Sequence, residues 1–134
     1  MTQNECIRAF MAANNLNAQT FSNGRTAKKI FDLVKLLRPV WEFQTQEELK
    51  ICESHPNIDP ANMTIEIKDG ITTEDAVKEL DDMQAKLREL GGMETEIKAE
   101  RFTIDLSKEQ VRISGKEIED LEPFILFTDG DEAQ

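Results

Sequence analysis

The side chains of this sequence that could react or bind a metal are few and far apart. Its 134 residues include one histidine, His55, and two cysteines, Cys6 and Cys52. A histidine-based zinc or iron site needs several ligands at close spacing, and no nucleophile motif surrounds His55. Because His55 lies in the proline-containing segment SHPNIDPANM, we expect it to be a solvated loop residue. We expect both cysteines to be reduced, partly buried thiols.

The glycine-rich and acidic segments have simple structural explanations. Gly91 and Gly92 follow a predicted helix instead of opening one, so they indicate a helix end and not a phosphate loop. The C-terminal TDGDEAQ has too few ligands for a calcium loop. Adjacent carboxylates such as Asp81 and Asp82 point about 100° apart on a helix and usually face solvent. We therefore predict no catalytic residue, no metal site and no cofactor, and a protein that is not an enzyme.

The negative charge is concentrated in the C-terminal part of the chain. Residues 1–53 carry 7 Lys/Arg and 6 Asp/Glu, whereas residues 54–134 carry 9 and 21, which gives +1 and −12 for a total of −11. Phosphate contacts need clustered cations. We therefore expect neither direct nucleic-acid binding nor attachment to an anionic membrane.

The hydropathy pattern predicts a protein that stays where it is made. No apolar run approaches the roughly 20 residues that a membrane-spanning helix needs, and the start MTQNECIRAF has neither a basic nor an apolar signal region. We expect a cytoplasmic location.

The most regular pattern is a long amphipathic helix over residues 24–53. Apolar side chains recur in it at three- and four-residue spacing: Ile30, Leu33, Val34, Leu37, Val40 and Trp41. Pro39 removes one backbone donor and its ring presses on the carbonyl of Lys35, so the helix must kink there or break in two. We favour a kink, because the apolar stripe continues in phase past Pro39.

A short helix is predicted before this one. Thr2 and Glu5 have the spacing of a capping box, which favours a helix over residues 3–14. We expect its inner face to carry Ile7, Phe10 and Met11.

The second half of the chain is predicted to hold a second long helix and a small sheet. Thr72 and Asp75 have a capping spacing, and an apolar stripe then predicts a helix over residues 73–90, antiparallel to the first. Residues 94–113 alternate apolar and charged side chains, which predicts an antiparallel sheet. A short helix starting near Ser114 and an apolar FILF segment follow.

These patterns predict an α+β protein. The two long helices, kinked at Pro39 in the first, pack with the small antiparallel sheet and with short N- and C-terminal helices. We expect a single domain over residues 1–127 and an acidic, disordered tail over residues 128–134.

The unusual feature is a cluster of cations near the start of the first long helix. Positive charge at the start of a helix interacts unfavourably with the helix dipole, at a cost of a few tenths of a kcal/mol per residue. One interpretation is a solvated face whose small penalty the core outweighs. The other is an interaction surface, because apolar side chains flank the cations. The candidate interaction residues are Arg25, Lys28, Lys29, Phe31, Lys35, Leu36, Arg38 and Phe43.

The second long helix carries the matching acidic residues. These are Glu74, Asp75, Glu79, Asp81 and Asp82. They could receive the basic face of another copy of the chain, which would give a homo-oligomer. Alternatively, they could imitate nucleic acid and inhibit a nucleic-acid-processing or defence protein of the host. An unrecognised enzyme or small-molecule binder is the remaining alternative.

The order of segments resembles a family of small uncharacterised proteins of tailed bacteriophages and prophages. The segments are RTAKKIFDLVKLLRPVWEFQTQEELKICE, EDAVKELDDMQAKLREL, TEIKAERFTIDL and ISGKEIEDLEPFILF. The last is the most specific, with Ser114, Glu117, Ile118, Leu121, Glu122, Pro123, Phe124 and Ile125 matching the family pattern. Pro39 and the short proline-rich connection between the long helices depart from that pattern. The resemblance implies a phage-derived protein in a bacterial cytoplasm and supplies no catalytic residue. We predict an accessory protein that binds a protein partner or itself.

Overall fold

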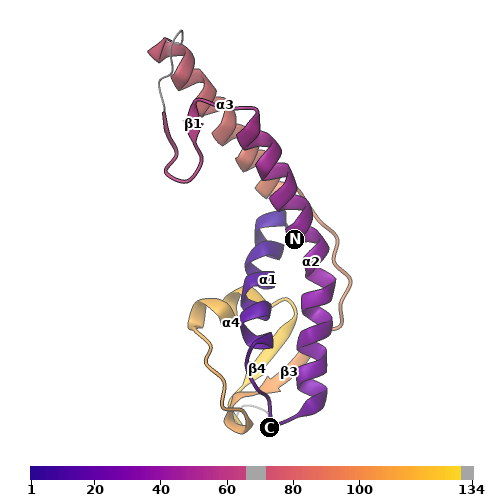
Figure 1. Ribbon diagram of the computed structural model, residues 1–134. Helices are drawn as coiled ribbons and strands as arrows, with labels where there is room; N and C mark the ends of the chain where they lie inside the picture. Colours follow the sequence, from indigo (N-terminus) through magenta and orange to yellow (C-terminus); the bar gives the residue numbers. More distant parts are fainter. Residues whose placement is uncertain (66–71, 131–134) are drawn as a thin grey trace. The chain divides into compact units, whose positions relative to one another are not determined.

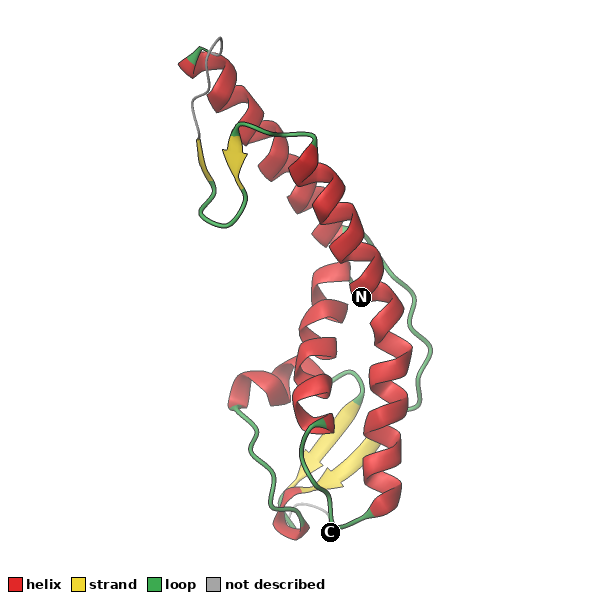
Figure 2. Ribbon diagram, in the orientation of Figure 1, coloured by secondary structure: helices red, strands yellow, loops and turns green. Residues whose placement is uncertain are grey.

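The computed structural model describes residues 1–65 and 72–130. It is an α+β protein, as predicted (Figures 1 and 2). The chain packs as two compact units, which are considered one at a time. Unit 1 contains Met1–Trp41 and Glu94–Gln134, and unit 2 contains Glu42–Met93. The expectation of one domain over residues 1–127 stays a prediction.

Helix α1 (Gln3–Asn17) begins with the predicted capping box. The Thr2 hydroxyl accepts the Glu5 N–H, and the Glu5 carboxylate accepts the Thr2 N–H, both at 3.1 Å. The helix runs three residues beyond the predicted 3–14. Its inner face differs from the prediction, because Met11 is 56% exposed. Phe10 is buried as predicted, and the other buried positions are Gln3, Cys6, Ala9, Ala12, Ala13 and Leu16.

Helix α2 (Gly24–Glu53) has the predicted bounds and remains one helix through Pro39. The Ala27 N–H donates to the Asn23 carbonyl, and the Asn23 side chain accepts the Arg25 N–H at 2.9 Å. Asn23 therefore supplies the helix start with acceptors. Pro39 does not split the helix, which excludes the alternative of two helices.

The sheet of unit 1 differs from the predicted antiparallel sheet over residues 94–113. That range holds one strand, β3 (Phe102–Asp105), which pairs in parallel with β4 (Ile125–Thr128). The Phe102 N–H donates to the carbonyl of Phe124 at 3.1 Å. The alternating pattern in residues 94–113 identified inward-facing side chains correctly, but it could not reveal that the partner strand lies at the end of the chain.

Between the two strands the chain forms a 3₁₀ turn, η1 (Leu106–Lys108), and helix α4 (Gly115–Leu121). Ser114 and Glu117 form a second capping box at the start of α4. Thr128, which we had placed in the tail, is buried at the end of β4. Residues 131–134 of the predicted tail lie outside the described residues.

The core of unit 1 lies between α1, the first part of α2, and the β3–β4 pair. Its fully buried side chains include Leu16, Ile30, Val34, Leu37 and Leu121. Ile104 of β3 and Ile125 of β4 complete it. The alternation in residues 94–113 predicts six inward side chains, Ile97, Phe102, Ile104, Leu106, Val111 and Ile113. Ile104 is in the core, and the other five are partly buried against it.

Unit 2 contains the last part of α2, a hairpin of β1 (Ile58–Asp59) and β2 (Thr64–Ile65), and helix α3 (Thr73–Gly92). The end of α2 and α3 run in opposite directions (Figure 1). The Thr72 hydroxyl accepts the Asp75 N–H and caps α3. The sequence TIEIKDG (residues 64–70) predicts a short strand that ends in an Asp69–Gly70 turn, and this turn lies outside the described residues. Within residues 42–65 and 72–93, the buried apolar side chains are Ile58, Ala76, Met83 and Leu90.

In the part of the chain that the structure describes, no helix combines the length and the apolar character needed to span a membrane.

Candidate interaction surfaces

Three cations of α2 in unit 1 share one outer side of the helix with an aromatic ring. We call Lys28, Phe31, Lys35 and Arg38 the basic face of α2. Their spacing of three, four and three residues places them on one side of a helix. The buried positions Ile30, Leu33, Val34 and Leu37 lie on the other side. Phe31 is 47% exposed.

The basic face has few intramolecular partners. Lys28 Nζ lies 2.9 Å from Asp32 Oδ2, and both side chains are largely exposed. Lys35 Nζ lies 5.5 Å from the centroid of the Phe31 ring, a cation–π arrangement. Arg25 and Arg38 are exposed and form no ion pair with any residue in 1–65 or 72–130. The face therefore presents cations around one exposed aromatic ring.

Two of the candidate residues belong to a different side of α2. Leu36 follows Phe31 by five residues, so it lies about 140° around the helix from it. Lys29 and Leu36 line a pocket of about 380 Å³ between α2 and the extended segment 98–102. Lys29 Nζ lies 5.7 Å from the Phe102 ring centroid across this pocket. The structure thus separates the predicted interaction residues into an outer face and a pocket.

Phe43, the last candidate interaction residue, belongs to unit 2 and is 44% exposed. The basic face of α2, in contrast, belongs to unit 1. The exposure of Phe43 agrees with the expectation from sequence.

The candidate acidic residues of α3 fall into two groups. Glu74 Oε1 lies 3.7 Å from Nζ of Lys78, one turn along the helix. Asp75 and Asp81 are exposed. Glu79 and Asp82, in contrast, accept hydrogen bonds from the segment that follows α2. The acidic surface is therefore smaller than the sequence suggested.

His55 is buried, which contradicts the prediction of a solvated loop residue. Only 4% of it is exposed. Its Nε2 lies 2.7 Å from Asp82 Oδ2, and its Nδ1 lies 2.6 Å from the carbonyl oxygen of Ile51 and 2.9 Å from Ser54 Oγ. Serine, histidine and aspartate are thus neighbours here, although no sequence motif announces them.

This arrangement does not have the hydrogen bonding of a catalytic triad. The histidine nitrogen that faces the serine must accept the hydroxyl proton. His55 Nδ1 makes its shorter contact with the Ile51 carbonyl, which can only accept, so Nδ1 carries a proton. The Ser54 hydroxyl donates to the same carbonyl at 2.8 Å. Both side chains therefore cap the end of α2, and His55 is not placed to act as a base toward Ser54.

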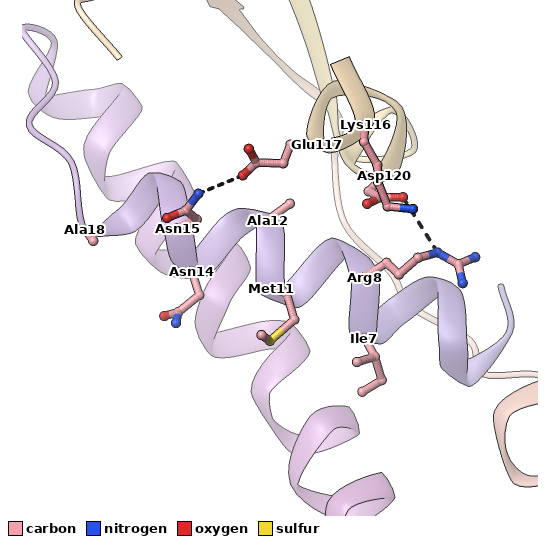
Figure 3. A pocket seen from close by; sticks show the side chains of 10 residues that line it. All are labelled: Ile7, Arg8, Met11, Ala12, Asn14, Asn15, Ala18, Lys116, Glu117 and Asp120. Carbon is pink, nitrogen blue, oxygen red and sulfur yellow. Dashed lines mark hydrogen bonds and ion pairs between the residues drawn. The ribbon is translucent and has the colours of Figure 1, made fainter. Parts of the chain in front are cut away.

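A shallow groove lies between α1 and α4 in unit 1 (Figure 3). It has a volume of about 570 Å³, and Met11 and Ile7 contribute apolar surface from α1. Two polar contacts connect its sides: Arg8 Nε lies 3.6 Å from Asp120 Oδ1, and the Asn15 amide donates to Glu117 Oε2 at 2.9 Å. The pKa of Glu117 is lowered, chiefly by the hydrogen bond from Asn15. These contacts join α1 to α4.

Metal ligands do not gather in the described part of the chain. Residues 1–65 and 72–130 contain no group of three or more histidine, cysteine, aspartate and glutamate side chains that could hold a metal ion.

Comparisons with protein-family models, curated proteins and solved structures found no significant match to this chain. The resemblance to phage proteins therefore stays a prediction.

Proposed function

We propose that this chain acts through protein–protein interaction, with the basic face of α2 as its contact surface. The observation that carries the proposal is the exposed Phe31 ring with Lys28, Lys35 and Arg38 around it. Aromatic residues and arginine are enriched in protein interfaces. An exposed aromatic ring among cations fits a partner that offers an apolar patch surrounded by carboxylates.

A second copy of the chain is the partner that the sequence itself supplies. The chain has a net charge of −11, and Glu74, Asp75 and Asp81 remain exposed on α3. Opposite charges across an interface accelerate association and fix its orientation. We propose self-association in the cytoplasm of a bacterial host, as a non-enzymatic accessory protein of phage or prophage origin. The resemblance of the closing segment, residues 113–127, supports that origin.

Mimicry of nucleic acid has less support than self-association. A mimic needs free carboxylates at regular spacing, but Glu79 and Asp82 are already hydrogen-bonded within unit 2. Among residues 1–65 and 72–130, no contact or distance specifically favours an enzyme or a small-molecule binder.

The proposal is tested by light scattering on the full chain. We expect the wild-type mass to rise with protein concentration and to fall with added salt, which screens exposed charges. The triple variant Lys28→Glu, Lys35→Glu and Arg38→Glu should stay monomeric.

A matched control variant changes the net charge by the same amount at other positions of unit 1. Lys98, Lys108 and Lys116 are exposed and lie outside the basic face. Their replacement by Glu should leave self-association intact apart from a small general effect of charge. A wild-type chain that is monomeric at every concentration, or an equal loss in both triple variants, contradicts the proposal.

A further inference from the structure

We propose that unit 2 contains a proton-dependent clasp, in which doubly protonated His55 ties the end of α2 to Asp82 of α3 and releases it as the pH rises. The inference is independent of the proposed function, because it concerns unit 2 and not the basic face of α2. We use the word clasp for His55, Asp82 and the Ile51 carbonyl.

The geometry around the ring requires a proton on each nitrogen. The Ile51 carbonyl oxygen, 2.6 Å from Nδ1, can only accept a hydrogen bond, so Nδ1–H donates to it. An ionised Asp82 carboxylate, 2.7 Å from Nε2, can also only accept, so Nε2–H donates to it. With 4% of His55 exposed, water has little access to replace either partner. The ring is therefore an imidazolium when the clasp is closed.

The charges around His55 favour this positive form on balance. Asp82 is negative, and the end of α2 presents the negative pole of its helix dipole. Lys86 opposes the charge and lies 3.1 Å from the same Asp82 oxygen. Of the other titratable groups, Cys52 and Glu53 on α2 and Asp59 on β1 lie within four residues of His55 in the sequence, and Glu79 on α3 contacts Asn57, two residues from His55. Glu79 is bonded to Asn57, and Asp59 accepts from Ala61 and Asn62.

Burial is the largest influence on His55 and by itself lowers its pKa. The hydrogen bond to Ile51 and the hydrogen bond and charge of Asp82 together outweigh burial, so the pKa of His55 is raised above its ordinary 6.5. A raised pKa in the folded state means that the stabilisation is fully present below pH 6.5. It is lost as the pH rises through the pKa of the folded form.

Deprotonation leaves one ring nitrogen with a lone pair directed at an oxygen. Loss of the Nε2 proton, which faces the ionised Asp82 carboxylate, replaces a partly buried hydrogen bond by repulsion between two acceptors. Loss of the Nδ1 proton has the same effect at the Ile51 carbonyl, where only the Ser54 hydroxyl, 2.9 Å away, can donate to the nitrogen instead. Unit 2 has few buried apolar side chains in its described residues, so its packing depends on such polar links. Opening of the clasp would loosen the adjoining Asn57–Glu79 contact and the buried Ile58 of the hairpin.

The clasp can be observed directly, because His55 is the only histidine of the chain. In nuclear magnetic resonance spectra of the wild type, we expect both ring nitrogens to be protonated at pH 6.5 and the ring to titrate above this value. Amide exchange of residues 55–65 reports opening. After correction for intrinsic rates, the opening equilibrium should rise by up to about tenfold per pH unit between the unfolded and folded pKa values of His55.

A pair of isosteric variants separates the clasp from the general charge of α3. Asp82→Asn removes the carboxylate that accepts from His55, whereas Asp81→Asn removes an exposed neighbour of equal charge. We expect Asp82→Asn to lower the His55 pKa and to remove most of the pH dependence of exchange in residues 55–65. Asp81→Asn should leave the titration of His55 and the exchange of residues 55–65 as they are in the wild type.

Two results would overturn the proposal. One is a wild-type ring that is neutral at pH 6.5 or titrates at or below that pH, which needs no variant to establish. The other is an equal effect of the two variants on the titration of His55. If Asp82→Asn unfolds unit 2, the wild-type titration and its exchange profile still decide the question.

Discussion

Asn57 contacts Glu79 through two hydrogen bonds that occupy both oxygens of one carboxylate. The Asn57 N–H donates to Oε1 at 3.2 Å, and its side-chain amide donates to Oε2 at 2.7 Å. Asn57 is 6% exposed, so these bonds replace its contacts with water. Glu79 is therefore part of the folded structure of unit 2 and is not a free acidic residue.

Replacing Glu79 by Gln should destabilise unit 2. A glutamine offers a single oxygen, and its amide group would face an Asn57 donor. Hydrogen bonds to charged groups contribute about 1.5–3 kcal/mol each, so we expect a loss of about 2 kcal/mol of unfolding free energy. Urea unfolding followed by circular dichroism measures it. Glu89→Gln, an exposed position on the same helix, should change stability by less than about 0.5 kcal/mol; equal losses would refute the structural role of Glu79.

The aromatic pair of unit 1 gives a second prediction. Phe10 and Trp41 stack with ring centroids 5.4 Å apart and an interplanar angle of 26°. Phe10 is 5% exposed. Phe10→Ala should therefore cost about 3–5 kcal/mol and shift the emission of Trp41, the only tryptophan, to the red. The control Met11→Ala removes an exposed neighbour and should do neither; unchanged emission in Phe10→Ala would show that the stack does not form.

Pro39 gives a third prediction. It is exposed within α2, and proline at such a position costs about 3 kcal/mol relative to alanine in an ordinary helix interior. Pro39→Ala restores a donor toward the Lys35 carbonyl, so we expect stabilisation of about 1–3 kcal/mol. Thermal unfolding measures the change, with Arg38→Ala as an exposed control expected to have little effect. A destabilised Pro39→Ala protein would show that Pro39 is favoured by its surroundings.

The two cysteines should differ in reactivity. Cys6 is fully buried, and Cys52 is partly exposed. Burial raises the pKa of both thiols, so little thiolate is present at neutral pH. We expect a thiol reagent to label Cys52 slowly and Cys6 only when unit 1 unfolds. The variants Cys6→Ser and Cys52→Ser each leave one thiol, so they assign a labelling rate to each cysteine. Faster labelling of Cys6 than of Cys52 would contradict this packing.

Local periodicity was sufficient to predict the helices. The apolar stripe through Ile30 and Leu37 gave α2 its bounds, and the exposure of Phe31 follows from its position outside this stripe. The capping boxes at Thr2 and Ser114 were also visible, because both partners lie within one helical turn. These features depend on residues close together in the sequence.

Long-range contacts were the features that the sequence did not reveal. Residues 102–105 pair with residues 125–128, and alternation in one strand does not identify its partner. His55 was expected in solvent because it precedes Pro56 in a proline-containing segment. Its burial depends on Asp82, 27 residues further along the chain. The only sequence feature that could have indicated the contact between His55 and Asp82 was a single histidine near the end of a long helix that is followed by an acidic helix.

The most direct test of the proposed interaction is a dilution series of ¹H–¹⁵N spectra of the wild-type chain. If the basic face of α2 mediates self-association with the acidic residues of α3, concentration-dependent shifts should centre on residues 28, 31, 35 and 38 and on residues 74, 75 and 81. These shifts should disappear in the triple Glu variant. Spectra that do not change on dilution, or shifts that centre on the groove between α1 and α4, would contradict the account.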